Sequence, residues 1–175
     1  VTLEQNTSNR QMDELLAALG EHNHIGLIFT MPNADTEGRG LFRKIKSFCS
    51  ERQNARVYTS LGQLLYLSCI KHVDGVIGNS SSGLIEVPSF KKGTINIGDR
   101  QRGRLKASSV IDCEPKCQAI KVALEHLYSK AFQAKLPMVK NLYGDGGASD
   151  SIVQILEKHS LENLLKKQFN DLPGT

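Results

Sequence analysis

Three consecutive serines, Ser80, Ser81 and Ser82, follow an apolar run that ends at Gly78, and Glu86 comes one helical turn further along. Small residues let the backbone approach a ligand, and the N–H groups and dipole at the start of a helix favour an anion such as a diphosphate. Serine hydroxyls can donate to phosphate oxygens, and a glutamate can accept two hydrogen bonds from a vicinal diol. This spacing favours a nucleoside diphosphate site, with phosphate at the helix start and ribose one turn in.

The same residues allow a plainer interpretation. A cluster of asparagine and serine is common at helix N-termini, where the side chains cap free N–H groups. Glu86 would then be a solvated acid in the first turn. Neither a Walker loop nor a dinucleotide fingerprint is present, because the glycine spacing of both motifs is missing. On the residues alone, both interpretations stay open.

A basic loop is the second candidate feature. Six basic residues lie between Lys91 and Lys106, and Arg100 and Arg104 are the preferred candidates for contacts with a diphosphate or a sugar. Guanidinium groups suit phosphate because they donate two parallel hydrogen bonds. A solvated surface loop is the alternative. We expect no nucleic acid partner, because no aromatic platform accompanies the charge.

The elements that must position these residues alternate between strand and helix patterns. Apolar runs predict strands at 25–29, 56–58, 74–78, 94–97 and 110–111. Helical spacing predicts helices ending at Gly20 and spanning 41–52, 61–71, 81–90, 114–131 and about 148–169. Wholly apolar strands separated by helices indicate a parallel sheet covered on both faces. We expect a three-layer, Rossmann-like α/β domain, with ligands beyond the carboxyl ends of the strands.

The glycine-rich segment Tyr143–Gly147 marks the expected boundary within this domain. We assign residues 1–147 to the ligand-binding domain and residues 148–175 to C-terminal helices of the same domain. The segment is expected to be a turn with positive φ angles, in which Asp145 caps the following helix. A second phosphate loop is the alternative.

Composition narrows the function classes. The net charge of +4 suits a small anionic ligand. The four cysteines form no CxxC pair, and neither they nor the scattered histidines have metal-site spacing, so we predict no metal and no cofactor. No apolar run is long enough to span a bilayer and no leader pattern opens the chain, so we expect a reduced, cytoplasmic protein. The start at Val1 suggests a piece of a longer protein.

Several segments together resemble a known family. These are Gly78–Glu86 (GNSSSGLIE), Asn96–Arg104 (NIGDRQRGR) and Asn141–Gly146 (NLYGDG), with Val1–Thr2 and Met31–Asp35 (MPNAD) also fitting. In order and separation they resemble the hydrolysing UDP-N-acetylglucosamine 2-epimerases. The resemblance implies one half of a glycosyltransferase-B type fold, and this chain is similar to the C-terminal domain.

The resemblance also implies an activity for the intact enzyme. Such an enzyme eliminates UDP from the sugar to give a glycal, adds water, and yields N-acetylmannosamine and UDP for sialic acid or nonulosonate synthesis. The family's catalytic groups lie in its N-terminal domain and just before the position of Val1. The resemblance therefore implies no catalytic residue here, binding without turnover, and partnership with an N-terminal domain of the same chain. It also implies a homodimer and a C-terminal helix that straps the two domains together.

Site residues follow from the resemblance position by position. Ser80 and Ser81 match the diphosphate contacts, Glu86 the ribose contact and Asn33 an asparagine that lines the cleft. Thr59 and Leu61 match the positions that pack on uracil. The family's Pro-Phe pair at that place reads Ser60-Leu61 here, which puts an aromatic stack on the base in question but leaves backbone pairing to uracil.

Two other function classes stay open from the sequence. A glycosyltransferase of the same fold would share the phosphate-binding helix, and a nucleotide sensor would bind without any reaction. The Gly-Asn-Ser-Ser-Ser-Gly run and the Asp-Arg-Gln-Arg-Gly-Arg loop favour the epimerase. Release of free N-acetylmannosamine by the full-length protein would separate the three classes.

Overall fold

The computed structural model describes residues 7–31, 38–160 and 162. The chain divides into two compact units, Val1–Tyr143 and Gly144–Thr175. Each is described by itself.

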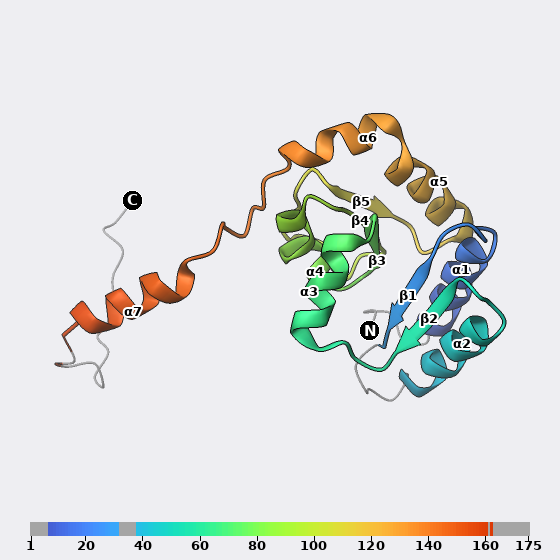
Figure 1. Cartoon of the computed structure of the whole chain (residues 1–175), viewed down its shortest axis with the longest axis horizontal. Coiled ribbons are helices and arrows are strands. Elements are labelled where there is room, and N and C mark those ends of the chain that lie inside the picture. Colours follow the sequence, from blue (N-terminus) through green and yellow to red (C-terminus); the bar gives the residue numbers. More distant parts are fainter. Residues whose placement is uncertain (1–6, 32–37, 161, 163–175) are drawn as a thin grey trace, which may run out of the picture. The chain divides into compact units, whose positions relative to one another are not determined.

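The first unit is an α/β structure with parallel strands, as the alternating pattern predicts (Figure 1). Strands β1 (Leu27–Thr30) and β2 (Ala55–Tyr58) pair in parallel. Strands β3 (Gly75–Gly78), β4 (Gly93–Ile97) and β5 (Val110–Cys113) form a second parallel sheet in that order. The α/β parallel class is thus confirmed, with the strands hydrogen-bonded in two sheets.

Helices connect these strands in the expected alternation. The first unit contains α1 (Ser8–Gly20), α2 (Gly38–Ser50), α3 (Gly62–His72), α4 (Ser82–Ile85), α5 (Cys117–Tyr128) and α6 (Lys130–Lys135), together with the 3₁₀ turns η1 (Val87–Phe90) and η2 (Leu136–Met138). The helix that was expected to end at Gly20 does so. Two of the other predicted helices differ from the structure.

The predicted helix over 81–90 is wrong in its length. The α-helix covers only Ser82–Ile85, and η1 continues from Val87. Pro88 explains the break, because proline has no N–H to donate and its ring clashes with the carbonyl four residues earlier. Lys91, in the left-handed region at φ 57°, closes the turn.

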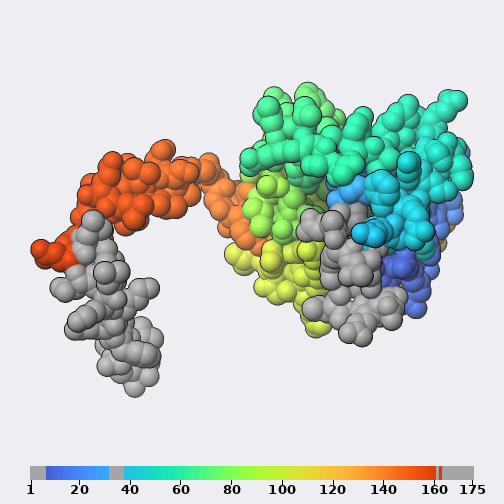
Figure 2. Space-filling view, turned by 90° about the horizontal axis from the view of Figure 1, so that it is seen from below, coloured from blue at the N-terminus to red at the C-terminus, as the bar shows by residue number. Residues whose placement is uncertain are grey.

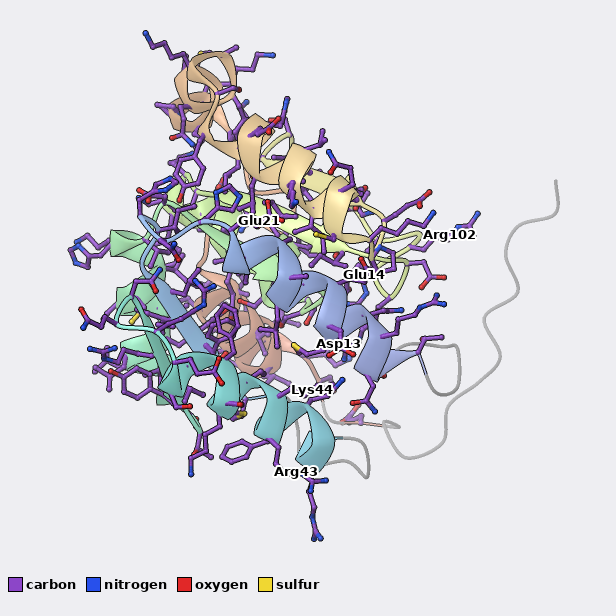
Figure 3. The ribbon with its side chains drawn as sticks, turned by 90° about the vertical axis from the view of Figure 1, so that its right-hand side faces the viewer. Asp13, Glu14, Glu21, Arg43, Lys44 and Arg102 are labelled. Atoms are coloured by element: carbon purple, nitrogen blue, oxygen red, sulfur yellow. The ribbon has the colours of Figure 1, made fainter. Side chains whose placement is uncertain are left out.

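The predicted single helix over 114–131 is also wrong. Helix α5 begins at Cys117, whose N–H donates to the carboxylate of Glu14 on α1 at 2.6 Å; Glu14 is labelled in Figure 3. The helix stops before Ser129, which is extended at ψ 139°. The Ser129 hydroxyl accepts from the N–H of Phe132 at 3.3 Å and so caps α6.

The core of the first unit is built around β4, all five residues of which are buried. Ile95 of β4 packs with apolar residues of α1, α5 and α6, including Leu19, Ile120, Leu127 and Phe132. At the surface, Asp13 of α1 and Lys44 of α2 form an ion pair at 2.6 Å (Figure 3).

The second unit contains α7 (Ala148–Lys158). Gly144, Gly146 and Gly147 before it have φ angles of 112°, 97° and 77°, which confirms the predicted positive-φ turn. Asp145 does not cap the helix as predicted: Gly147 occupies the cap position and no side chain bonds there. The helix predicted to continue to about residue 169 ends at Lys158, where His159 is extended at ψ 130°. Positions 161 and 163–169 of that prediction lie outside the described residues.

Within the described ranges, no helix is long and apolar enough to cross a membrane.

Candidate functional site

The serine loop, defined as Asn79–Ser82, connects β3 to α4. A local hydrogen bond stabilises the turn of this loop: the N–H of Ser82 donates to the hydroxyl of Ser80 at 3.3 Å. The carbonyl of Ser80 accepts from the N–H of Gly83 at 3.2 Å, and the carbonyl of Ser81 accepts from the N–H of Leu84 at 3.0 Å. In contrast, the N–H groups of Ser80 and Ser81 have no acceptor among the described residues. Two neighbouring donors are therefore available to an anion.

The short α4 changes the electrostatic argument made from the sequence. A macrodipole is the sum of aligned peptide dipoles, so four residues contribute less than the longer helix that was expected. The attraction for an anion at this loop must come mainly from individual N–H groups, hydroxyls and nearby cations.

Close packing fixes α4 on the sheet. A Cβ atom at Gly83 would lie 2.6 Å from the Cγ2 methyl of Thr94 on β4, so only glycine fits without displacement. The Thr94 hydroxyl donates to the carbonyl of Gly83 at 2.7 Å. The position of the serine loop is thus set by the most buried strand of the unit.

The arginine loop, defined as Asp99–Arg104, follows β4 and is fastened to the serine loop. Gln101 is 2% exposed, and its Nε2 donates to the carbonyl of Asn79 at 2.8 Å. Nη1 of Arg100 lies 3.4 Å from the same carbonyl and 3.5 Å from Oδ1 of Asn79. The structure therefore brings Arg100 beside the serines. Sequence reasoning missed Gln101, because nothing in the local pattern distinguishes a buried glutamine between two arginines.

Arg104, the other predicted arginine, is not brought to the serine loop. Its N–H donates to the carbonyl of Gln101 at 3.3 Å, while its side chain is exposed and has no partner in the described part of the chain. Arg102 is likewise exposed and extends outward (Figure 3).

Glu86 stands at the end of α4, where it is half-buried. Tyr66 of α3 contacts the start of the same helix. Its hydroxyl lies 2.7 Å from the hydroxyl of Ser82, in a hydrogen bond that either atom can donate. Burial raises the pKa of Tyr66 above its ordinary value and the negative charge of Glu86 raises it further, while the bond to Ser82 lowers it. Tyr66 was missed by sequence reasoning; a single phenol in a leucine-rich helix was its only signal.

Of the two residues predicted to pack on uracil, Leu61 and Thr59, only the first lines the cavity that the serine loop also lines. Leu61, which precedes α3, lines the same cavity as the serine loop. Thr59 is exposed and does not line it. Asn33, which was predicted to line the cleft, lies outside the described residues.

A cavity of about 810 Å³ joins these features. Its polar lining includes Ser80, Ser81, Ser82, Tyr66 and Arg100, whereas Glu86 and Arg104 are not part of it. Its volume is in the range of small-molecule sites. It also runs along β1 and β3, which belong to different sheets. Figure 2 shows α3, in blue-green, along one border of this unit.

Comparison with known proteins identifies the chain's relatives. A family model described as UDP-N-acetylglucosamine 2-epimerase matches residues 1–157. The chain is 40% identical to the polysialic acid biosynthesis protein P7 of Escherichia coli over 98% of its own length and 44% of the relative. It is 37% identical to the hydrolysing GDP/UDP-N,N'-diacetylbacillosamine 2-epimerase of Campylobacter jejuni, over 98% of its own length and 45% of the relative. The chain thus spans just under half the length of these curated relatives.

The fold is also found in solved structures. The S. aureus MnaA–UDP co-structure aligns with a TM-score of 0.70, at 18% identity, over 97% of this chain and 46% of that one. At this identity the likeness concerns the fold alone. It confirms the predicted Rossmann-like α/β domain, one half of a glycosyltransferase-B type architecture.

Proposed function

The chain belongs to the UDP-N-acetylglucosamine 2-epimerase family, and on that premise we propose that its first unit binds the UDP part of UDP-N-acetylglucosamine. One observation carries the proposal. The N–H groups of Ser80 and Ser81, which have no acceptor among the described residues, stand beside the guanidinium of Arg100 at the wall of the cavity. Clustered amide donors beside a cation are suited to a diphosphate.

Each predicted residue has a role in this proposal. The diphosphate bonds to the N–H groups and hydroxyls of Ser80 and Ser81, with Arg100 neutralising charge. The hydroxyl of Ser82 donates to a phosphate oxygen and accepts from the hydroxyl of Tyr66. Arg104, exposed and without a side-chain partner in the described ranges, is the second cation.

The nucleoside would lie further along α4 and toward α3. The half-buried carboxylate of Glu86 accepts from the ribose hydroxyls, and the backbone near Leu61 pairs with uracil. Thr59 and Asn33 complete the walls around the base and sugar. None of these residues is proposed to take part in bond breaking.

The complete protein is proposed to be the hydrolysing epimerase. Since the chain spans just under half the length of its curated relatives, a second domain is proposed to supply the groups that eliminate UDP and add water, giving N-acetylmannosamine. Helices after residue 148 would strap the two domains, and the intact enzyme would be a homodimer. A cytoplasmic location is proposed because the four cysteines are free.

Titration of nucleotides into this chain by calorimetry tests the proposal. UDP is expected to bind best, followed by UMP and ADP, with no sugar turnover. GDP belongs in the series because one relative's name includes it. Loss of a hydrogen bond to a charged group predicts that Ser81→Ala and Glu86→Ala each weaken UDP by about tenfold or more. The exposed Ser47 on α2 gives the matched control Ser47→Ala, which should bind as the wild type does. Equal affinity for ADP and UDP would contradict the uracil assignment.

A further inference from the structure

The side chain of Asn141 lies against the end of α4, to which it is remote in sequence. Its Nδ2 donates to the carbonyl of Ile85 at 2.7 Å and to the hydroxyl of Ser89 at 2.6 Å. Its Oδ1 accepts from the N–H of Tyr143 at 2.9 Å. Because the Tyr143 N–H requires the amide oxygen on its side, the amide nitrogen must face Ile85. The amide is therefore held in one orientation by three hydrogen bonds.

The carbonyl of Ile85 depends on this donor because the helix ends there. In a continuing α-helix it would accept from the N–H of Ser89. Here that N–H donates to the carbonyl of Glu86 at 3.0 Å, because the chain has changed to the 3₁₀ turn η1. Carbonyls at a helix end need a side chain or water as a partner. Asn141 supplies that partner.

The peptide bond between Ile85 and Glu86 is consequently held at both of its polar atoms. Its carbonyl accepts from Asn141, and its N–H, which belongs to Glu86, donates to the carbonyl of Ser82 at 2.9 Å. This peptide plane carries the Cα of Glu86 and so sets the direction in which the side chain leaves the backbone. The carboxylate itself makes no hydrogen bond within the described part of the chain.

From this geometry we infer that Asn141 is a positioning residue for the ribose: it aims the carboxylate of Glu86 by fixing the 85–86 peptide. The inference rests on the proposed function and deepens it, since it assigns discrimination between ribose and deoxyribose to a residue outside the cavity wall. A residue that acts only through Glu86 has a smaller effect on a ligand that offers Glu86 one ribose hydroxyl instead of two.

The experiment compares UDP with 2′-deoxyuridine diphosphate on the whole chain. The wild type is expected to bind UDP about tenfold more tightly, the effect of one hydrogen bond to a charged acceptor. In Asn141→Ala, UDP affinity should fall several-fold and the affinity for the deoxy ligand should fall less, so that the ratio of the two affinities moves toward one. Asn141→Asp, which keeps the acceptor for Tyr143 and loses the donor to Ile85, should shift the ratio in the same direction. In a Glu86→Ala background, Asn141→Ala should have no further effect on the ratio.

The control is Lys91→Met. Nζ of Lys91 donates to the carbonyl of Val139, so this variant loosens the same segment without touching the 85–86 peptide. It should leave the ratio of the two affinities at the wild-type value. Equal losses for both ligands in Asn141→Ala, or an unchanged ratio in both Asn141 variants, overturn the inference while the proposed function stands. A wild type that binds no UDP removes the proposed function and the inference together.

Discussion

The first unit has two sides that are buried to different extents. On one side, β4 is buried along its whole length, and Thr94 and Gln101 tie the loops above it to the sheet and to each other. On the other side, β1 and β2 alternate between half-buried or buried and exposed residues, and α3 exposes Leu64 by 80%. Both sides contribute to one cavity.

From this difference we infer that different parts of a nucleotide would contact regions that are buried to different extents. The proposed phosphate and ribose contacts are attached to the buried strand β4, with hydrogen bonds across the fold that hold the donors in place before a ligand arrives. Preorganised donors lose little entropy on binding. The residues expected to face the base belong to the exposed side. We therefore expect diphosphate and ribose to contribute most of the affinity of this chain, and the base to contribute less.

The largest predicted effect sharpens the contrast in packing. A Cβ atom at Gly93 would overlap the side chain of Leu127 and lie 2.9 Å from the ring of Phe132. At Gly26, beside β1, a Cβ atom would have no described residue within 4 Å other than its chain neighbours. Gly93→Ala should lower the free energy of unfolding by about 1–3 kcal/mol, the range for overpacked cores. Gly26→Ala should change it by less than about 0.5 kcal/mol. Urea denaturation measures both, and equal effects would contradict the contrast.

The second prediction concerns the link between the two sides. Tyr66 of α3 bonds to Ser82 at 2.7 Å, whereas the exposed hydroxyl of Tyr128 donates to Asp74 at 3.3 Å. Removing a typical hydrogen bond costs about 1 kcal/mol. Tyr66→Phe should therefore lower stability by about 1 kcal/mol and weaken UDP binding, while Tyr128→Phe should have a smaller effect on stability and none on binding. Stability is measured by urea denaturation and binding by calorimetry. If the two variants behave alike, Tyr66 does not connect α3 to the site.

A third prediction concerns how the stability of the chain depends on pH through Cys113 of β5. Burial, and then the negative charge of Asp112, raise the pKa of Cys113 on β5 from its ordinary value of 9.0 to about 11. Between these values the folded chain keeps a proton that the unfolded chain has lost, so stability should fall as the pH rises through this window. Cys113→Ala should show a shallower fall.

Measurement between pH 9 and 10 is the most informative for this prediction. Burial also raises the pKa of Tyr66 and Tyr128 above their ordinary value of 10.0, so they add a fall of the same sign at higher pH. Urea midpoints of wild type and Cys113→Ala that fall in parallel over this range would show that Cys113 is not the source.

Local sequence patterns predicted most of the elements but few of their ends. The apolar runs identified five strands because a buried parallel strand needs apolar side chains throughout, as in β4. Pro88 could have shown that α4 must be short, since its effect on a helix is local. The start of α5 at Cys117 could not be read in this way, because it depends on Glu14 from a distant helix.

In the candidate site, too, some residues were predictable from the sequence and others were not. The serines and Arg100 follow strand ends, and the carboxyl ends of parallel strands meet at one edge, so their proximity was predictable from topology. Gln101, Tyr66 and Asn141 matter only through contacts made across the fold, and these contacts have no local pattern. Arg104 shows the converse: a suitable residue type in a suitable loop whose side chain the structure leaves exposed.

The smallest predicted effect tests whether the exposed side is exposed in solution. Leu64 is 80% exposed on α3, whereas Ile70 of the same helix is 1% exposed. Leu64→Ser should change the free energy of unfolding by no more than about 0.5 kcal/mol, while Ile70→Ser should cost several times more, because it leaves a cavity and a buried hydroxyl. Urea denaturation at two protein concentrations measures both variants. A large loss for Leu64→Ser that grows with protein concentration would mean that α3 is covered by a second copy of the chain, and the two sides of the unit would then be equally buried.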